Sequence, residues 1–81
     1  MKIKKGFLIK GTNRKIVKIP KRVTTIGMEA FKDCDKIEEI ILPEGLTLIS
    51  DGAFENCISL KEIVIPNGVI IGERALWGAS H

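Results

Sequence analysis

Histidine and cysteine are too scarce in this sequence for the common metal centres and catalytic sets. The one histidine is His81, and the two cysteines are Cys34 and Cys57. A zinc site needs three or four convergent nitrogen and sulfur ligands, and neither cysteine belongs to a Cys-x-x-Cys pair. There is also no Ser/His/Asp set and no phosphate-binding glycine loop. We therefore expect no enzyme activity, no cofactor, no metal and no small-molecule substrate.

Long apolar runs are missing as well. No stretch approaches the roughly 18 apolar residues of a membrane-spanning helix. Behind the first lysines the apolar stretch covers only residues 7–9, whereas a secretory signal needs about 7–15. We expect one small domain of 81 residues without a membrane span. It would be intracellular as it stands, or an excised piece of a longer protein.

Acidic residues are absent from the first 22 positions. This segment carries nine Lys and Arg, while residues 23–81 carry four Lys and Arg and all ten Asp and Glu. The formal charge is therefore +9 followed by −6, which adds up to the net +3 of the chain. The basic segment could bind nucleic acid or an anionic surface, complement the acidic remainder, or protect an edge strand from aggregation. Nucleic acid is the weakest alternative, because Phe7 is the only aromatic residue there that could stack on bases.

Three prolines, Pro20, Pro43 and Pro66, lie 23 residues apart and mark an internal repeat. The third copy has one residue fewer between Val69 and Ala75 and ends before another strand. The matching positions are Val23, Leu46 and Val69; Ile26 and Ile49; Ala30 and Ala53; Phe31 and Phe54; Cys34 and Cys57; and Ile40 and Ile63.

Each repeat is expected to contain a strand that ends at the proline, which has no N–H for the sheet. Side chains alternate along a strand, so we expect Ile40, Leu42, Ile63 and Ile65 to face the core. One or two turns of helix should follow a second short extended piece, because the inward residues have the spacing i, i+1, i+4. These inward residues are Ala30, Phe31 and Cys34, and then Ala53, Phe54 and Cys57.

The pattern Ile/Leu-Pro-x-x-Val/Leu-x-x-Ile-x-x-x-Ala-Phe-x-x-Cys-x-x-Ile/Leu, over residues 17–79, resembles the BspA-type leucine-rich repeats. Such repeats occur in many bacterial surface proteins and some protist proteins. The resemblance implies an α/β repeat fold: a leucine-rich-repeat solenoid of two full coils and an incomplete third, with short helices on one side and strands on the other. An N-terminal β-hairpin cap would join residues 6–10 to residues 16–20 through a turn at 11–13. The expected division of this single domain, residues 1–81, is the cap 1–19, the coils 20–42 and 43–65, and the incomplete coil 66–81.

Family members usually serve adhesion or partner binding, so the resemblance implies a protein-interaction module, displayed at the cell surface or secreted. The partner would be an unidentified protein, or a second copy stacked on the open terminal coil. The alternative is a structural terminal fragment of a longer array with no separate activity.

Outward-facing strand residues are the candidate partner surface, since solenoids commonly bind partners on the strand side. β-propensity on a half-exposed surface would also explain the apolar ones. Trp77 occupies the position of Lys32 and Glu55 in the earlier copies, so we expect it exposed, as a cap or a subunit contact rather than a ligand site. The strand candidates form two rows: Lys18, Ile41 and Val64, and Ile16, Glu39 and Glu62.

Three interpretations of the two cysteines stay open. Adjacent coils should bring Cys34 and Cys57 within roughly 5 Å, which permits a disulfide. A ladder of small, buried, reduced thiols is favoured, and a catalytic thiol is least expected because no histidine lies nearby. The acids of the strands and turns are expected to form a solvated face rather than an acid/base pair.

Overall fold

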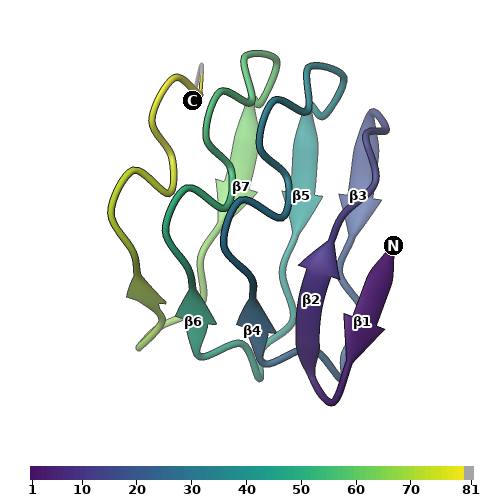
Figure 1. The fold of residues 1–81 in the computed structure, drawn as a ribbon, viewed down its shortest axis with the longest axis vertical. Coiled ribbons are helices and arrows are strands. Elements are labelled where there is room, and N and C mark those ends of the chain that lie inside the picture. Colours follow the sequence, from purple (N-terminus) through teal and green to yellow (C-terminus); the bar gives the residue numbers. More distant parts are fainter. Residues whose placement is uncertain (80–81) are drawn as a thin grey trace.

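The computed structural model describes residues 1–79, and this part of the chain folds into eight short strands in two sheets. One sheet has five strands in the order β1-β2-β4-β6-β8, and the other has three in the order β3-β5-β7 (Figure 1). The strands are β1 (Lys2–Lys4), β2 (Phe7–Lys10), β3 (Ile16–Lys18), β4 (Thr25–Ile26), β5 (Glu39–Ile41), β6 (Leu48–Ile49), β7 (Glu62–Val64) and β8 (Ile70–Ile71).

Equivalent strands of consecutive repeats lie side by side and pair in parallel (Figure 1). In the three-stranded sheet Val17 pairs with Ile40, and Ile40 pairs with Ile63, each time 23 residues further along. In the five-stranded sheet Leu48 pairs with Ile70 instead, an offset of 22, because the third repeat is one residue shorter. The repeat period of the sequence therefore sets which residues of neighbouring strands pair with each other.

The expected hairpin between residues 6–10 and 16–20 is wrong. The N-terminal antiparallel pair consists of β1 and β2, and its turn is closed by Lys5 and Gly6, which both have positive φ (51° and 80°). β2 then pairs with β4, while β3 belongs to the other sheet. Both strands bury a residue in the same core, Leu8 from β2 and Val17 from β3, so residues 11–15 cross from one sheet to the other.

The expected helices are also wrong: residues 1–79 contain no helix. The segments predicted as helical are successive turns in which alternate backbone amides have different partners. An α-helix needs each interior amide to bond within its own segment, and here every second amide donates to the next repeat. Within the segment, Ala30, Lys32 and Cys34 donate to Gly27, Glu29 and Phe31; across to the next repeat, Glu29, Phe31 and Asp33 donate to Asp51, Ala53 and Glu55, all at 2.8–3.2 Å.

Left-handed backbone conformations reverse the chain at two positions of each turn segment. In the first segment Glu29 and Asp33 have φ values of 55° and 63°. The equivalent positions hold Gly52 and Asn56 in the second segment and Arg74 and Gly78 in the third, again with positive φ. Such a conformation interrupts a right-handed helix. Because it recurs four residues apart in each segment, each turn ends before a helix can form.

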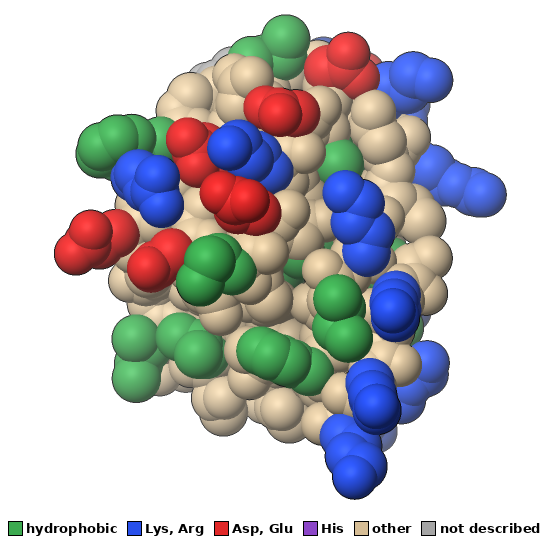
Figure 2. Space-filling model, viewed as in Figure 1, with side chains coloured by type: hydrophobic (Ala, Val, Ile, Leu, Met, Phe, Trp, Pro, Cys, Tyr) green, Lys and Arg blue, Asp and Glu red, His purple; other side chains and the backbone are tan. Residues whose placement is uncertain are grey.

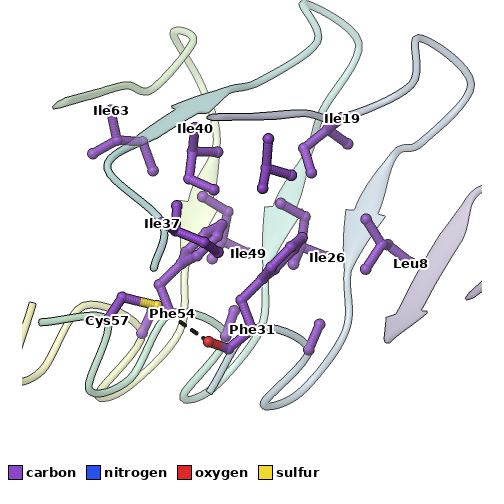
Figure 3. Packing of buried hydrophobic residues seen from close by; sticks show 14 of the residues in the cluster. Leu8, Ile19, Ile26, Phe31, Ile37, Ile40, Ile49, Phe54, Cys57 and Ile63 are labelled. Atoms are coloured by element: carbon purple, nitrogen blue, oxygen red, sulfur yellow. Dashed lines mark hydrogen bonds between the residues drawn. The ribbon is translucent and has the colours of Figure 1, made fainter. Parts of the chain in front are cut away.

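The core lies between the two sheets and the turn segments (Figure 3). Phe31 and Phe54 are fully buried and stack with their ring centroids 5.2 Å apart and their planes 17° from parallel. Ala30 and Ala53 are buried beside them, so these positions point inward as expected, although turns rather than helices present them. Ile40 and Ile63 are buried too, whereas Leu42 and Ile65 only pack partly against the core.

Gly11 closes the N-terminal end of the phenylalanine stack. Its amide donates to the Ala30 carbonyl at 2.9 Å, and a Cβ atom at Gly11 would overlap the ring of Phe31. We expect Gly11→Ala to lower the free energy of unfolding by about 1–3 kcal/mol, as overpacking usually does. Urea denaturation measures this change.

Gly45→Ala is the matched control, because nothing lies within 4 Å of a Cβ atom there. A surface change of this kind should alter stability by less than about 0.5 kcal/mol. Equal effects of the two substitutions would contradict the contact of Gly11 with Phe31.

Candidate functional site

The outer side of β3, β5 and β7 carries all six strand residues of the predicted partner surface. We call these residues the strand face: Ile16, Lys18, Glu39, Ile41, Glu62 and Val64. Their inward neighbours in the three strands are buried. The register joins Ile16, Glu39 and Glu62 into one row and Lys18, Ile41 and Val64 into a second. Val64 is 72% exposed, so apolar surface lies open to solvent beside carboxylates.

Trp77 does not belong to the strand face. It lies in the turn segment that follows β8, and its carbonyl accepts the Asn56 amide at 2.6 Å. Its side chain is 65% exposed. The geometry therefore separates Trp77 from the other six predicted residues.

A groove of about 800 Å³, open to solvent, lies over β5, β7 and the turns that follow them. Apolar residues and carboxylates line it together, without any lysine or arginine. We call it the strand-face groove; its lining residues are Glu39, Ile40, Ile41, Leu42, Glu44, Glu62, Val64, Ile65, Pro66 and Asn67.

Part of this lining was missed from the sequence. Leu42 and Ile65 were assigned to the core, yet they are only partly buried and line the groove. Glu44 belongs to the turn after β5, and Pro66 directly precedes the turn after β7. The signal was present in the repeat itself, because residues 42–44 and 65–67 occupy the same three positions of consecutive copies.

The groove carboxylates take no part in the two ion pairs found among residues 1–79. Those pairs join Lys32 to Glu29 at 3.5 Å and Lys61 to Glu38 at 3.4 Å. In the groove, Glu39 and Glu62 are register partners on neighbouring strands, so two like charges lie next to each other. Like charges directly opposite on a sheet destabilise it. The groove is acidic, although the chain carries a net charge of +3, because its lining holds three glutamates and no lysine or arginine.

Most basic residues lie toward the N-terminal strands, with Lys18 of β3 next to Ile41 in the register. All nine lysines and arginines of residues 1–22 are exposed, and neither ion pair of the described chain involves them. Figure 2 shows Lys and Arg side chains concentrated over the β1–β2 side and most Asp and Glu side chains away from it. The charge separation along the sequence is thus also a separation in space.

Cys34 and Cys57 are free thiols rather than a disulfide. The buried Cys57 Sγ donates to the Phe31 carbonyl at 3.1 Å (Figure 3). Burial raises the pKa of the Cys57 thiol to about 11, and the neighbouring Cys34 adds to this shift. Burial also raises the pKa of Cys34. Both thiols are therefore protonated at neutral pH, and the protonated form is neither the nucleophile nor the metal ligand.

Comparison with known protein families gives a match over nearly the whole chain. The model of the BspA type leucine rich repeat region (6 copies) matches residues 2–81. The chain belongs to the BspA-type leucine-rich-repeat family. This match confirms the resemblance seen in the repeat pattern. No curated protein and no solved structure shows a significant match.

The BspA-type repeats of this chain also leave an apolar row on the five-stranded sheet, which the sequence analysis did not identify. Phe7, Thr25, Leu48 and Ile70 are register partners; Phe7 and Ile70 are exposed and Leu48 is partly exposed. The alternation of inward and outward side chains along these strands could have predicted this row from the sequence. Residues 1–79 contain no helix able to cross a membrane, and no cluster of three His, Cys, Asp or Glu in that range could hold a metal ion.

The buried Cys57 thiol predicts a pH dependence of stability. An unfolded thiol ionises near its ordinary pKa of 9.0, whereas the folded protein keeps the proton up to about 11. The unfolded state therefore binds fewer protons between these values, and stability falls as pH rises through them. We expect this contribution to be complete below pH 9.0 and to fall by about 1.4 kcal/mol per pH unit above it.

Chemical denaturation of the wild type and of Cys57→Ala tests this expectation between about pH 8 and about pH 10.5. Lysines titrate in both proteins, so the informative quantity is the difference between their free energies of unfolding. That difference should shrink as the pH rises. A constant difference would contradict the raised thiol pKa.

Proposed function

We propose that this chain is a protein-binding module that contacts its partner through the strand face. The observation that carries the proposal is the groove, which brings exposed apolar residues and carboxylates together on one side of a sheet. Membership in a family of leucine-rich repeats supports the same function. Adhesion and display at the cell surface or secretion are the finer proposals that this family suggests.

The composition of the strand face supports binding of a protein rather than of a small molecule. Ile41 and Val64 lie next to each other in the register and expose apolar area that a partner would remove from water. The groove is open to solvent, whereas small-molecule sites usually enclose most of their ligand. An extended or flat protein surface can cover such a site more completely.

A peptide-display library selected on the immobilised chain tests the proposal. We expect the wild type to enrich specific sequences, and Ile41→Ser combined with Val64→Ser to weaken their binding at least about tenfold, a loss of about 1.4 kcal/mol. Ile58→Ser is the matched control, because Ile58 is an exposed isoleucine outside the groove.

Each variant is compared with the wild type by thermal melting before it is used. No enrichment, or enriched peptides that bind the strand-face variant as tightly as the wild type, would refute binding through the strand face.

Self-association is a second candidate, and the third repeat favours it. Ile71 occupies the position of the buried Ile26 and Ile49, yet it is 45% exposed. β8 is the last strand of its sheet among the described residues, so one side of it pairs with no strand of that part of the chain. A second copy, or further repeats if the chain is a segment of a longer array, could cover it.

Sedimentation equilibrium of the 81-residue chain tests self-association. We expect a dimer whose dissociation constant rises by at least about tenfold in Ile70→Glu combined with Ile71→Glu. Phe7→Glu is the control, because Phe7 is an exposed residue of β2, three strands away from β8 in the same sheet. A monomer at all concentrations, or equal effects of both changes, would rule out this candidate.

A further inference from the structure

We propose that the strand-face groove binds an extended protein segment with a cationic, an apolar and a second cationic side chain at alternating positions. This proposal rests on the proposed function, because it defines the chemistry of the partner at the same surface. It is carried by the order of the side chains along β5 and β7 and by the absence of any lysine or arginine from the lining.

The first cationic position is set by the pair Glu39 and Glu62. These residues are register partners on adjacent parallel strands, which places them about 4.8 Å apart across the sheet. Both also line a smaller neighbouring cavity together with Lys15 and Lys61, but neither takes part in an ion pair among the described residues. A lysine or arginine placed between two such carboxylates would remove their mutual repulsion and form two charge-assisted hydrogen bonds.

The apolar position follows two residues further along both strands. Ile41 and Val64 are again register partners and are both exposed. Two residues of a strand span about 6.6 Å, which is also the distance between side chains i and i+2 of an extended peptide. A segment running along the strands therefore presents an apolar side chain to this pair when its preceding cation contacts Glu39 and Glu62.

The second cationic position lies beyond the apolar pair. Glu44, in the turn after Pro43, lines the same groove and is exposed. It is a third carboxylate without an ion pair among the described residues. The groove thus offers negative, apolar and negative contacts in sequence, which an extended segment of the opposite pattern would match.

The three carboxylates of its lining make the groove itself unfavourable for polyanions, although Lys18 pairs in the register with Ile41 and lies beside it. A nucleic acid or an acidic peptide would meet three carboxylates with no compensating lysine or arginine in the lining. Nucleic-acid binding by the basic residues 1–22 stays a prediction from the sequence; most of these residues lie away from the groove, whereas Lys18 borders it on β3.

NMR titration of the full chain with short synthetic peptides tests the proposal. The probe has the sequence Gly-Lys-Ser-Val-Ser-Lys-Gly with blocked ends. One matched peptide carries glutamate in place of both lysines, and a second carries serine in place of valine. We expect the lysine–valine peptide to shift the backbone amides of β5 and β7, and the dissociation constant to rise with salt because the contacts are exposed.

Two triple variants separate the groove from the overall charge. The groove variant combines Glu39→Gln, Glu44→Gln and Glu62→Gln. The control variant combines Glu29→Gln, Glu55→Gln and Glu73→Gln, which removes the same charge from outside the groove. An exposed ion pair changes binding by about two- to fivefold, so the groove variant should bind the lysine–valine peptide at least about tenfold more weakly. The control should bind within about twofold of the wild type.

The outcomes distinguish this proposal from the more general one. Equal binding of the glutamate peptide, or equal effects of the two triple variants, would overturn the cationic preference and leave the strand face as a binding surface. Absence of any shift with all three peptides would overturn the proposal, while the display selection decides separately on protein binding. Concentration-dependent shifts of the same amides without peptide would assign the groove to a second copy and also overturn it.

Discussion

The alternation of backbone donors in the turn segments determines the rest of the structure. Phe31 donates its amide to Ala53 in the next repeat, while the following amide, from Lys32, stays within its own segment. Each repeat therefore satisfies only half of these donors by itself and depends on a neighbour for the others. Buried amides without partners are costly, so adjacent repeats are bound through their backbones as well as through the phenylalanine stack.

Side-chain hydrogen bonds strengthen the same dependence between repeats. Asn13 donates to Asp35 and accepts the Lys36 amide, both at 2.9 Å. Between the next two repeats, Asn56 donates to Asp33 at the same distance. These contacts join residues 22 or 23 positions apart, so short polar side chains bridge neighbouring repeats on the exposed side while the core joins them inside.

The repeat and its register were predictable, because a constant period places equivalent residues over one another. The replacement of the expected helices by turns was not predictable from spacing, because the inward spacing of Ala30, Phe31 and Cys34 fits two consecutive turns as well as a helix. Gly52, Asn56 and Gly78, at positions with left-handed backbone, were the signal that favoured turns. The strand face was predictable from the alternation of side chains along each strand. The groove was not, because the alternation predicts a buried Leu42, whereas β5 ends before Leu42 and Pro43 and the Leu42 side chain is partly exposed.

The separation of charge gives the molecule an electric dipole along the stacking direction of its repeats. Its positive end is the β1–β2 side (Figure 2). The acidic strand-face groove lies over β5 and β7, the strands further along the stack (Figure 1). A long-range field acts on this dipole before any contact is made. An anionic surface would therefore attract the positive end and hold the acidic groove away from it, whereas a cationic surface would orient the molecule the opposite way.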